Sequence, residues 1–226
     1  MGSHALLSAS SSKRWLSCPP SARLCAEVED TTSEYAKEGT DAHTLCEYKV
    51  KKMLGIDMQD PTDSLSYYNE EMERCAEEYA SYILEIIEDA KQYCKDPLVL
   101  IEQRLDFSRY VPDGFGTGDC LIIADKTLYI VDFKYGKGVE VDSEDNPQMM
   151  CYAVGALELF NNLYDIENVC MVIYQPRIEN ISVSSMNVTE LYNWAENTLK
   201  PIAELAYEGK GEFKAGDHCQ FCKIKA

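Results

Sequence analysis

The sequence predicts a mixed α/β protein, in which an N-terminal layer of helices precedes a core of strands and helices. Before Pro97, apolar side chains recur at helical spacing, most clearly Tyr79, Ile83, Ile87 and Ala90. After Pro97 the pattern changes to short runs rich in β-branched residues, which is typical of strands. The 226 residues are enough for one domain with a substantial core.

Helices are expected in four segments of the N-terminal layer. The serines at 8–12 form a polar lead-in that caps a short helix carrying Trp15. Pro19 and Pro20 end that helix, because proline cannot continue the backbone hydrogen-bond pattern. Further helices are expected at residues 21–28, at 33–54, where Gly55 stops the helix, and at 67–94.

Strands dominate the next part of the chain. Strands are expected at 98–107, 118–124, 127–135 and 169–175, and helices at 147–160 and 188–207. The expected order is helices, three strands, helix, strand, helix.

The net charge of the chain argues against some classes of function. Lys and Arg number 21 against 39 Asp and Glu, a net charge of −18. Composition alone therefore argues against a protein that binds nucleic acid through a basic surface. Much of the acid lies between Glu70 and Asp89, as on a solvated helix face. We expect no membrane contact, because no apolar run is long enough for a membrane span or a secretory leader.

One hairpin brings charged residues together inside an apolar setting. If Asp125 and Lys126 form its two-residue turn, Asp119 lies opposite Asp132, with Cβ atoms about 5 Å apart. Lys134 projects from the same face as Asp132. Two such carboxylates need a cation or a shared proton, and oxygen ligands suit Mg²⁺ or Mn²⁺. A plainer interpretation is that these aspartates are turn or edge residues and that Lys134 is a solvated charge.

Five short motifs resemble a known family. They resemble the PD-(D/E)xK nuclease superfamily, and within it the RecB-like exonuclease branch of phage and prophage type, which includes AddB-type and CRISPR-associated exonucleases. The resemblance implies a single nuclease domain over 1–226, with a restriction-endonuclease-like core of order αβββαβ. Its parts would be a helical layer at 8–96, the core at 97–208 and a cysteine-containing tail at 209–226. The motifs are Gly118-Asp119, Ile130-Val131-Asp132-Phe133-Lys134, Glu38-Gly39-Thr40-Asp41-Ala42-His43, Gln148-Met149-Met150-Cys151-Tyr152, and, counted together as the fifth, the cysteines of Ser17-Cys18-Pro19 and Cys219-x-x-Cys222.

The resemblance implies metal-dependent hydrolysis of DNA by an exonuclease acting in phage DNA recombination, repair or processing. It places the protein in the cytoplasm of a bacterial host, with a helicase or a single-strand annealing protein as a further partner. Mg²⁺ or Mn²⁺ would be held by His43, Asp119, Asp132 and the carbonyl of Phe133. The catalytic set would be Asp119, Asp132, Lys134, Gln148, Tyr152 and Glu102.

Each residue that the resemblance adds also has a purely structural interpretation. His43 alone would indicate a structural histidine. Gln148 and Tyr152 share one helix face and fit a core helix equally well. Glu102 fits an exposed carboxylate on a strand.

The cysteines are compatible with three kinds of site. Six of the ten stand alone in apolar surroundings and are expected as small core residues. The resemblance implies an iron–sulfur cluster ligated by Cys18, Cys219, Cys222 and a fourth cysteine beyond Ala226, so the chain is expected to be a truncated form or one that lost the cluster. Cys25 is a weaker substitute. A zinc site that includes His218 is the second possibility. The third possibility is that these cysteines are free thiols on a loose tail, and this is the one that we expect. We also expect Cys18 to lie near the C-terminal pair, Cys219 and Cys222. The six core cysteines are Cys46, Cys75, Cys94, Cys120, Cys151 and Cys170.

Two further classes of function compete with the nuclease. A binding module that keeps the nuclease fold but has little catalysis is favoured by the acidity of the chain. An acidic DNA mimic is the second, although a mimic has no use for a buried Asp-x-Lys hairpin.

Overall fold

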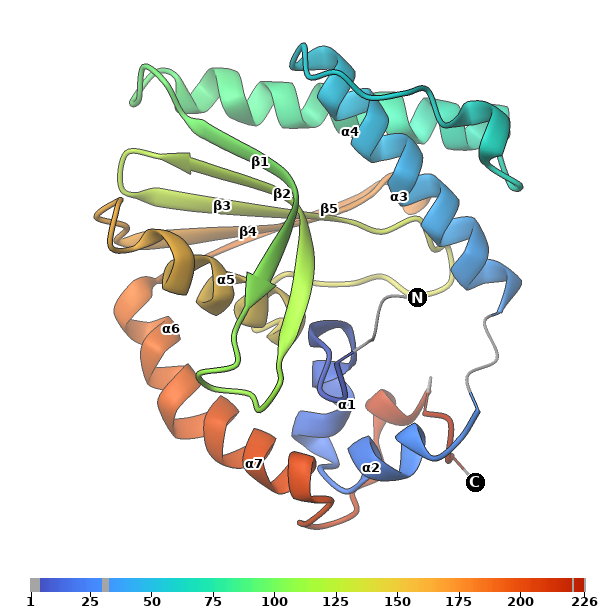
Figure 1. The fold of residues 1–226 in the computed structure, drawn as a ribbon, viewed down its shortest axis with the longest axis vertical. Coiled ribbons are helices and arrows are strands. Elements are labelled where there is room, and N and C mark those ends of the chain that lie inside the picture. Colours follow the sequence, from blue (N-terminus) through green and yellow to red (C-terminus); the bar gives the residue numbers. More distant parts are fainter. Residues whose placement is uncertain (1–4, 30–32, 221, 226) are drawn as a thin grey trace.

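A five-stranded mixed sheet forms the centre of the molecule, and helices pack on both of its faces (Figure 1). The computed structural model describes residues 5–29, 33–220 and 222–225. The strands lie in the order β1-β2-β3-β4-β5, and only β3 and β4 run parallel. Their bounds are β1 Leu98–Asp106, β2 Phe115–Ala124, β3 Thr127–Phe133, β4 Asn168–Gln175 and β5 Asn180–Asn187. This is the mixed α/β architecture that the sequence predicts.

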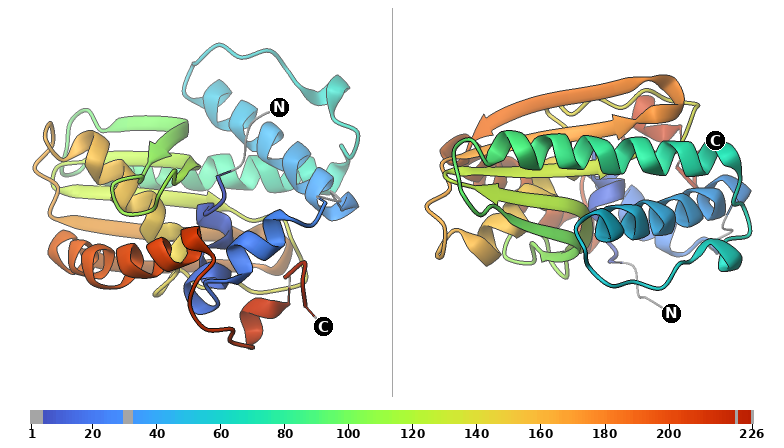
Figure 2. Two further views of the ribbon diagram at one scale, coloured as in Figure 1. Left: turned by 60° about the horizontal axis from the view of Figure 1, so that its bottom comes forward. Right: turned by 90° about the horizontal axis from the view of Figure 1, so that it is seen from above.

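Two long helices cover one face of the sheet. They are α3 (Glu34–Met53) and α4 (Glu70–Ala90), and the right-hand view of Figure 2 shows α4 lying across the strands. Polar caps start both helices, since the side chains of Ser33 and Asn69 accept bonds from backbone N–H groups of the first turn. Their apolar stripes pack against alternate residues of β2 and β3, including Cys120 and Val131.

The other face is covered by α5 (Pro147–Phe160) and by the N- and C-terminal helices. Asn146 caps α5 and Pro147 occupies its first turn, where a missing N–H costs nothing. Residues 149–157 of α5 are all buried. No helix in the described ranges combines the length and the apolar content needed to cross a membrane. The remaining helices are α1 Ser12–Ser17, α2 Ser21–Ala26, α6 Val188–Trp194 and α7 Lys200–Glu208, with a π-helical turn at Ala195–Leu199 between the last two.

The cysteines expected as core residues lie mostly inside these layers. Cys46 and Cys75 are buried in the helices α3 and α4, Cys120 in β2, and Cys151 in α5. The two exceptions, Cys94 and Cys170, are half-buried, because one follows α4 and the other lies on β4 near the edge of the sheet.

The element boundaries differ from the prediction at several ends. Strand β2 begins at Phe115 rather than Gly118, β3 ends at Phe133 rather than Tyr135, and α4 is shorter than 67–94. The extension of β2 depends on Gly116, because a Cβ there would lie 2.6 Å from Tyr152 Cε1. Glycine thus lets the Tyr152 ring pack directly against this strand.

Strand β5 was missing from the prediction. Its residues alternate between half-buried and exposed, yet the outward positions include Ile181 and Val183 while the inward ones include serines. This reverses the usual pattern of apolar residues facing inward, so the alternation gave no recognisable signal. The order αβββαβ is therefore extended by one strand.

Candidate metal centre

Three carboxylate residues occupy facing positions on three neighbouring strands. The ladder of β2 and β3 runs from Ala124 and Thr127 to Cys120 and Val131, which confirms the predicted hairpin register. Asp119 and Asp132 follow at the next position. On the other side of β2, Ile101 pairs with Cys120 and Gln103 with Gly118, so Glu102 lies opposite Asp119. The register explains why these carboxylates converge.

The backbone at Glu102 is distorted at this point. Its φ of 52° lies in the left-handed region, and the β1–β2 ladder omits the Glu102 and Asp119 pair although the register continues beyond it. Such a conformation costs a residue with a side chain roughly 1–3 kcal/mol and is frequent at functional sites.

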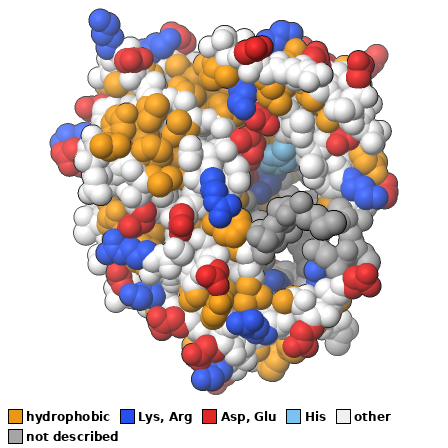
Figure 3. Space-filling model, in the orientation of Figure 1, with side chains coloured by type: hydrophobic (Ala, Val, Ile, Leu, Met, Phe, Trp, Pro, Cys, Tyr) orange, Lys and Arg blue, Asp and Glu red, His pale blue; other side chains and the backbone are white. Residues whose placement is uncertain are grey.

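Asp119, Glu102 and His43 form a group that fits a divalent cation. One ligand atom from each lies within 4.8 Å of the others. Two ligands of a cation bound at about 2.1 Å can be at most about 4.2 Å apart, so shifts of a few tenths of an ångström would close the set. One imidazole and two carboxylates suit Mn²⁺, and an all-oxygen set would suit Mg²⁺ better. Figure 3 shows a histidine beside acidic side chains in a hollow on this face.

Two contacts hold Asp119 in place. Its Oδ1 lies 3.3 Å from His43 Nδ1, and its Oδ2 accepts a 2.7 Å bond from the backbone N–H of Phe133. The rings of His43 and Phe133 meet edge to face at 5.4 Å, which fixes the imidazole against the strand.

Asp132 belongs to a second, adjoining arrangement. Its Oδ2 lies 2.9 Å from Lys134 Nζ, and its Oδ1 accepts a 3.1 Å bond from Gln148 Nε2. The Gln148 Oε1 accepts from Lys134 Nζ at 3.1 Å, so one amide ties the ammonium to the carboxylate. Gln148 Nε2 also lies 3.2 Å from the Tyr152 hydroxyl. Gln148 and Tyr152, four residues apart on α5, therefore face the charged residues of β3.

Burial and the neighbouring charges shift the pKa values of the ionisable groups in the site. Burial opposes protonation of His43, but the Asp119 carboxylate outweighs it and raises the pKa of His43 to about 9. Burial, reinforced by Asp119, raises the pKa of Glu102 to about 7. Burial would lower the pKa of Lys134, but Asp132 raises it, so the ammonium persists. Without a metal, the site holds a proton on His43 at neutral pH.

The structure thus brings together most of the residues predicted for the site, but they form two adjoining groups. His43, Asp119 and Glu102 meet around one point, whereas Asp132 contacts Lys134 and Gln148 and lies outside that group. Phe133, predicted as a ligand through its carbonyl, contributes its N–H to Asp119. Glu102 is half-buried and faces Asp119, unlike an exposed strand carboxylate.

Arg177, which no sequence pattern indicated, connects the helical layer to the sheet. Its guanidinium lies 2.7 Å from Glu71 on α4 and 3.4 Å from Glu38 on α3, and packs over the Tyr135 ring at 4.2 Å. Its side chain is only 10% exposed. Glu38 stands at the start of the motif that carries His43, so Arg177 fixes the helix that delivers the imidazole. No local pattern signals this, because the partners lie far apart in sequence.

A second group of cysteines gathers where α1 and α2 meet the C-terminal tail. Cys25 Sγ lies 3.7 Å from Cys222 Sγ, and both thiols are buried. Cys18, Cys219, Cys222 and His218 line one hollow of about 330 Å³. Cys18 therefore lies near the C-terminal pair, as predicted; Cys222 is buried, whereas residues 211–217 of the tail are exposed. Among the described residues, these thiols do not form a set of three within 4.8 Å of one another.

Two comparisons relate the chain to known proteins. A family model described as "Protein of unknown function (DUF2800)" matches residues 4–226. A solved structure described as "Crystal structure of SSO0001" is 16% identical, with the match covering 80% of this chain and 91% of that chain at a TM-score of 0.33.

Proposed function

The chain belongs to the DUF2800 family, and we propose that it is a metal-dependent deoxyribonuclease of the PD-(D/E)xK type. The observation that carries the proposal is that His43, Glu102 and Asp119 meet beside Asp132, which is buried and paired with the half-buried Lys134. Cation ligands can supply an activated water, and a fixed ammonium can stabilise charge on the reacting phosphate, so both features support phosphodiester hydrolysis. The motif resemblance selects DNA as the substrate and exonucleolytic cleavage as its mode.

The residues of the site would have distinct chemical roles. His43, Glu102 and Asp119 would hold Mn²⁺ or Mg²⁺, with Asp132 next to them. When bound, such a cation supplies an activated water and neutralises charge on a phosphate. Lys134 stabilises negative charge that develops on the phosphate, because Asp132 and Gln148 hold its ammonium in place. Gln148 and Tyr152 keep that ammonium oriented.

A binding module with little catalysis is the second candidate, and the charge of the surface favours it. The net charge is −18, and three basic side chains already have partners within the protein. Arg14 donates to Ser21, Arg23 to the Tyr207 carbonyl, and Lys137 pairs with Glu71. Each of these three basic side chains therefore already has a partner within the protein, which leaves it less available to a DNA phosphate.

Cleavage of end-labelled DNA decides between the two candidates. Single- and double-stranded substrates are incubated with the protein while Mn²⁺ or Mg²⁺ is titrated. We expect products only with a divalent cation, and none from Asp119→Asn. Asp125→Asn is the matched control, since it removes the same charge at a turn whose φ of 52° asparagine tolerates. DNA that is bound but never cut, with either cation, would leave the binding module as the function.

A further inference from the structure

Strand β5 forms an open border of the sheet. It pairs only with β4, and no backbone group elsewhere in the described residues bonds to the backbone of 180–187. Its eight residues include no charge and no proline, the two devices that normally protect an edge strand. The opposite border strand, β1, carries Glu102, Arg104 and Asp106. An edge with free N–H and C=O groups and no charge is a template for another strand.

A hollow lies between this edge and α4. Its volume is about 410 Å³, and it combines acidic with apolar and aromatic lining. The stacked rings of Tyr82 and Tyr174, 4.9 Å apart, contribute to it, and Ile181 beside them is 50% exposed. Val183, the next residue on the same face of β5, is 56% exposed. The acidic residues are Glu77, Glu78 and Glu85.

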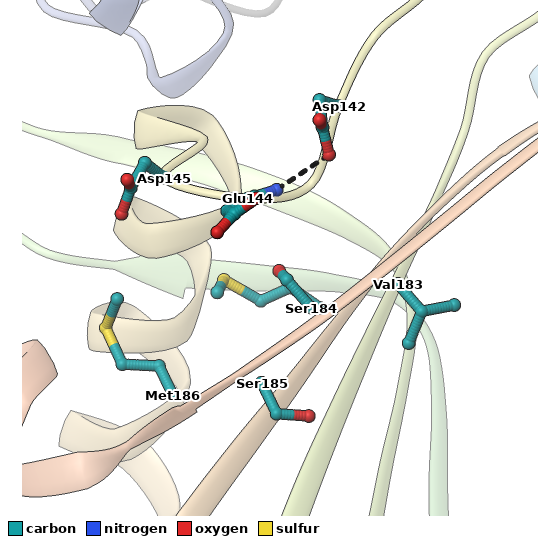
Figure 4. Close-up of a pocket in the computed structure, with 8 residues that line it drawn as sticks. Asp142, Glu144, Asp145, Val183, Ser184, Ser185 and Met186 are labelled. Carbon is teal, nitrogen blue, oxygen red and sulfur yellow. Dashed lines mark hydrogen bonds between the residues drawn. The ribbon is translucent and has the colours of Figure 1, made fainter.

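A second hollow runs along the same strand. Its volume is about 350 Å³, and Figure 4 shows Asp142, Glu144 and Asp145 beside it. Four consecutive residues of β5, 183–186, line it. Because neighbouring strand residues point to opposite faces, a hollow that touches all four must reach the backbone edge. The edge is thus flanked by acid on both sides.

The negative charge of these hollows indicates which kind of polypeptide segment would bind along β5. Their lining contains six carboxylates and one cation, Arg74, which pairs with Glu78 at 2.9 Å. A second copy of this chain would bring the same carboxylates together, whereas a basic segment would neutralise them. We propose that β5 is the docking site for an extended, basic segment of a partner protein, which adds a sixth strand to the sheet. Its alternate side chains would enter the two hollows. This proposal stands whether or not the protein is a nuclease.

A designed peptide tests the proposal. The probe has eight residues that alternate Lys and Val, with both termini blocked. The control peptide alternates Lys and Pro, which keeps the charge but cannot pair as a strand. Fluorescence anisotropy measures affinity, and amide hydrogen exchange locates the contact. We expect protection of residues 180–187 and an affinity at least about tenfold higher for the Lys–Val peptide.

Protein variants then locate the site. Val183→Lys and Glu85→Gln should each weaken binding of the Lys–Val peptide, the first by about tenfold or more. Glu85 lies on α4, so its variant leaves β5 unaltered. Leu163→Lys is the matched control, because Leu163 is 77% exposed and lies outside both hollows. Equal affinity of the two peptides, protection elsewhere, or no protection at about 1 mM peptide would overturn the proposal. So would a dimer of the protein alone with protected residues 180–187, since the edge would then bind a second copy.

Discussion

The molecule carries two clusters of chemically reactive side chains, and they are built in different ways. At the carboxylate site, a two-residue turn and a continuing register place Asp119 opposite its neighbours, and the charges then compensate one another. In the cysteine cluster, Cys25 and Cys222 are 197 residues apart and meet only because the tail returns to α2. The carboxylates of the first cluster are fixed by local strand geometry, although His43 reaches them from α3, and the second cluster is fixed by global packing. A sequence therefore predicts the first better than the second.

The largest expected effect is on catalysis by Lys134. Lys134→Ala should lower the rate of DNA cleavage about 10²–10³-fold, because one contact to the reacting phosphate is lost. Mn²⁺ affinity, measured by calorimetry, should change little, since Lys134 contacts Asp132 rather than the His43 group. Lys137→Ala is the control, as Lys137 is exposed and pairs with Glu71. If Lys134→Ala cleaved DNA at nearly the wild-type rate, the Lys134 ammonium would have no role in the reaction.

The next effect is the pH dependence of metal binding. The pKa of His43 is about 9, so a cation must displace its proton at neutral pH. Mn²⁺ affinity should therefore rise about tenfold per pH unit from pH 7 to pH 9. Below pH 7 the slope should steepen, because Glu102, with a pKa of about 7, gives up a second proton. Calorimetry in buffers of different ionisation enthalpy counts the protons released. An affinity that is constant over this range would remove His43 from the ligand set.

These two predictions concern residues that the sequence identified, and the reason is physical. A two-residue turn fixes all facing pairs of a hairpin, and four-residue spacing on a helix fixes Gln148 and Tyr152 to one face. The division into two arrangements was not predictable, because it depends on how α3 brings His43 to Asp119 rather than to Asp132. Neither strand β5 nor the contacts of Arg177 were predicted from the sequence, for related reasons. The outward side chains of β5 carry no usual pattern, and the partners of Arg177 lie on two distant helices.

A smaller effect is expected on stability at the helix anchor. Arg177→Met removes a largely buried cation and leaves Glu38 and Glu71 without it. Because the carboxylates are partly exposed, we expect a loss of about 1–3 kcal/mol, below the value for fully buried pairs. The melting temperature of a chain of this size should fall by roughly 2–10 °C in thermal unfolding. Lys137→Ala, which loses only an exposed contact to Glu71, should shift it far less. Equal melting temperatures of the two variants would show that Arg177 does not anchor α3.

The smallest effect is expected at the cysteines. Burial and the neighbouring Cys25 thiol raise the pKa of Cys222 in the metal-free protein, and among the described residues the tail thiols form no set of three within 4.8 Å of one another. We therefore expect a colourless protein, and Cys222→Ser should keep its Mn²⁺ affinity and its cleavage activity. Cys94→Ser, a substitution at a half-buried position away from the tail, is the matched control. Visible absorbance with bound iron, lost in Cys222→Ser but kept in Cys94→Ser, would contradict this prediction. It would show that the returning tail builds a cluster site, and that global packing too can assemble a metal centre here.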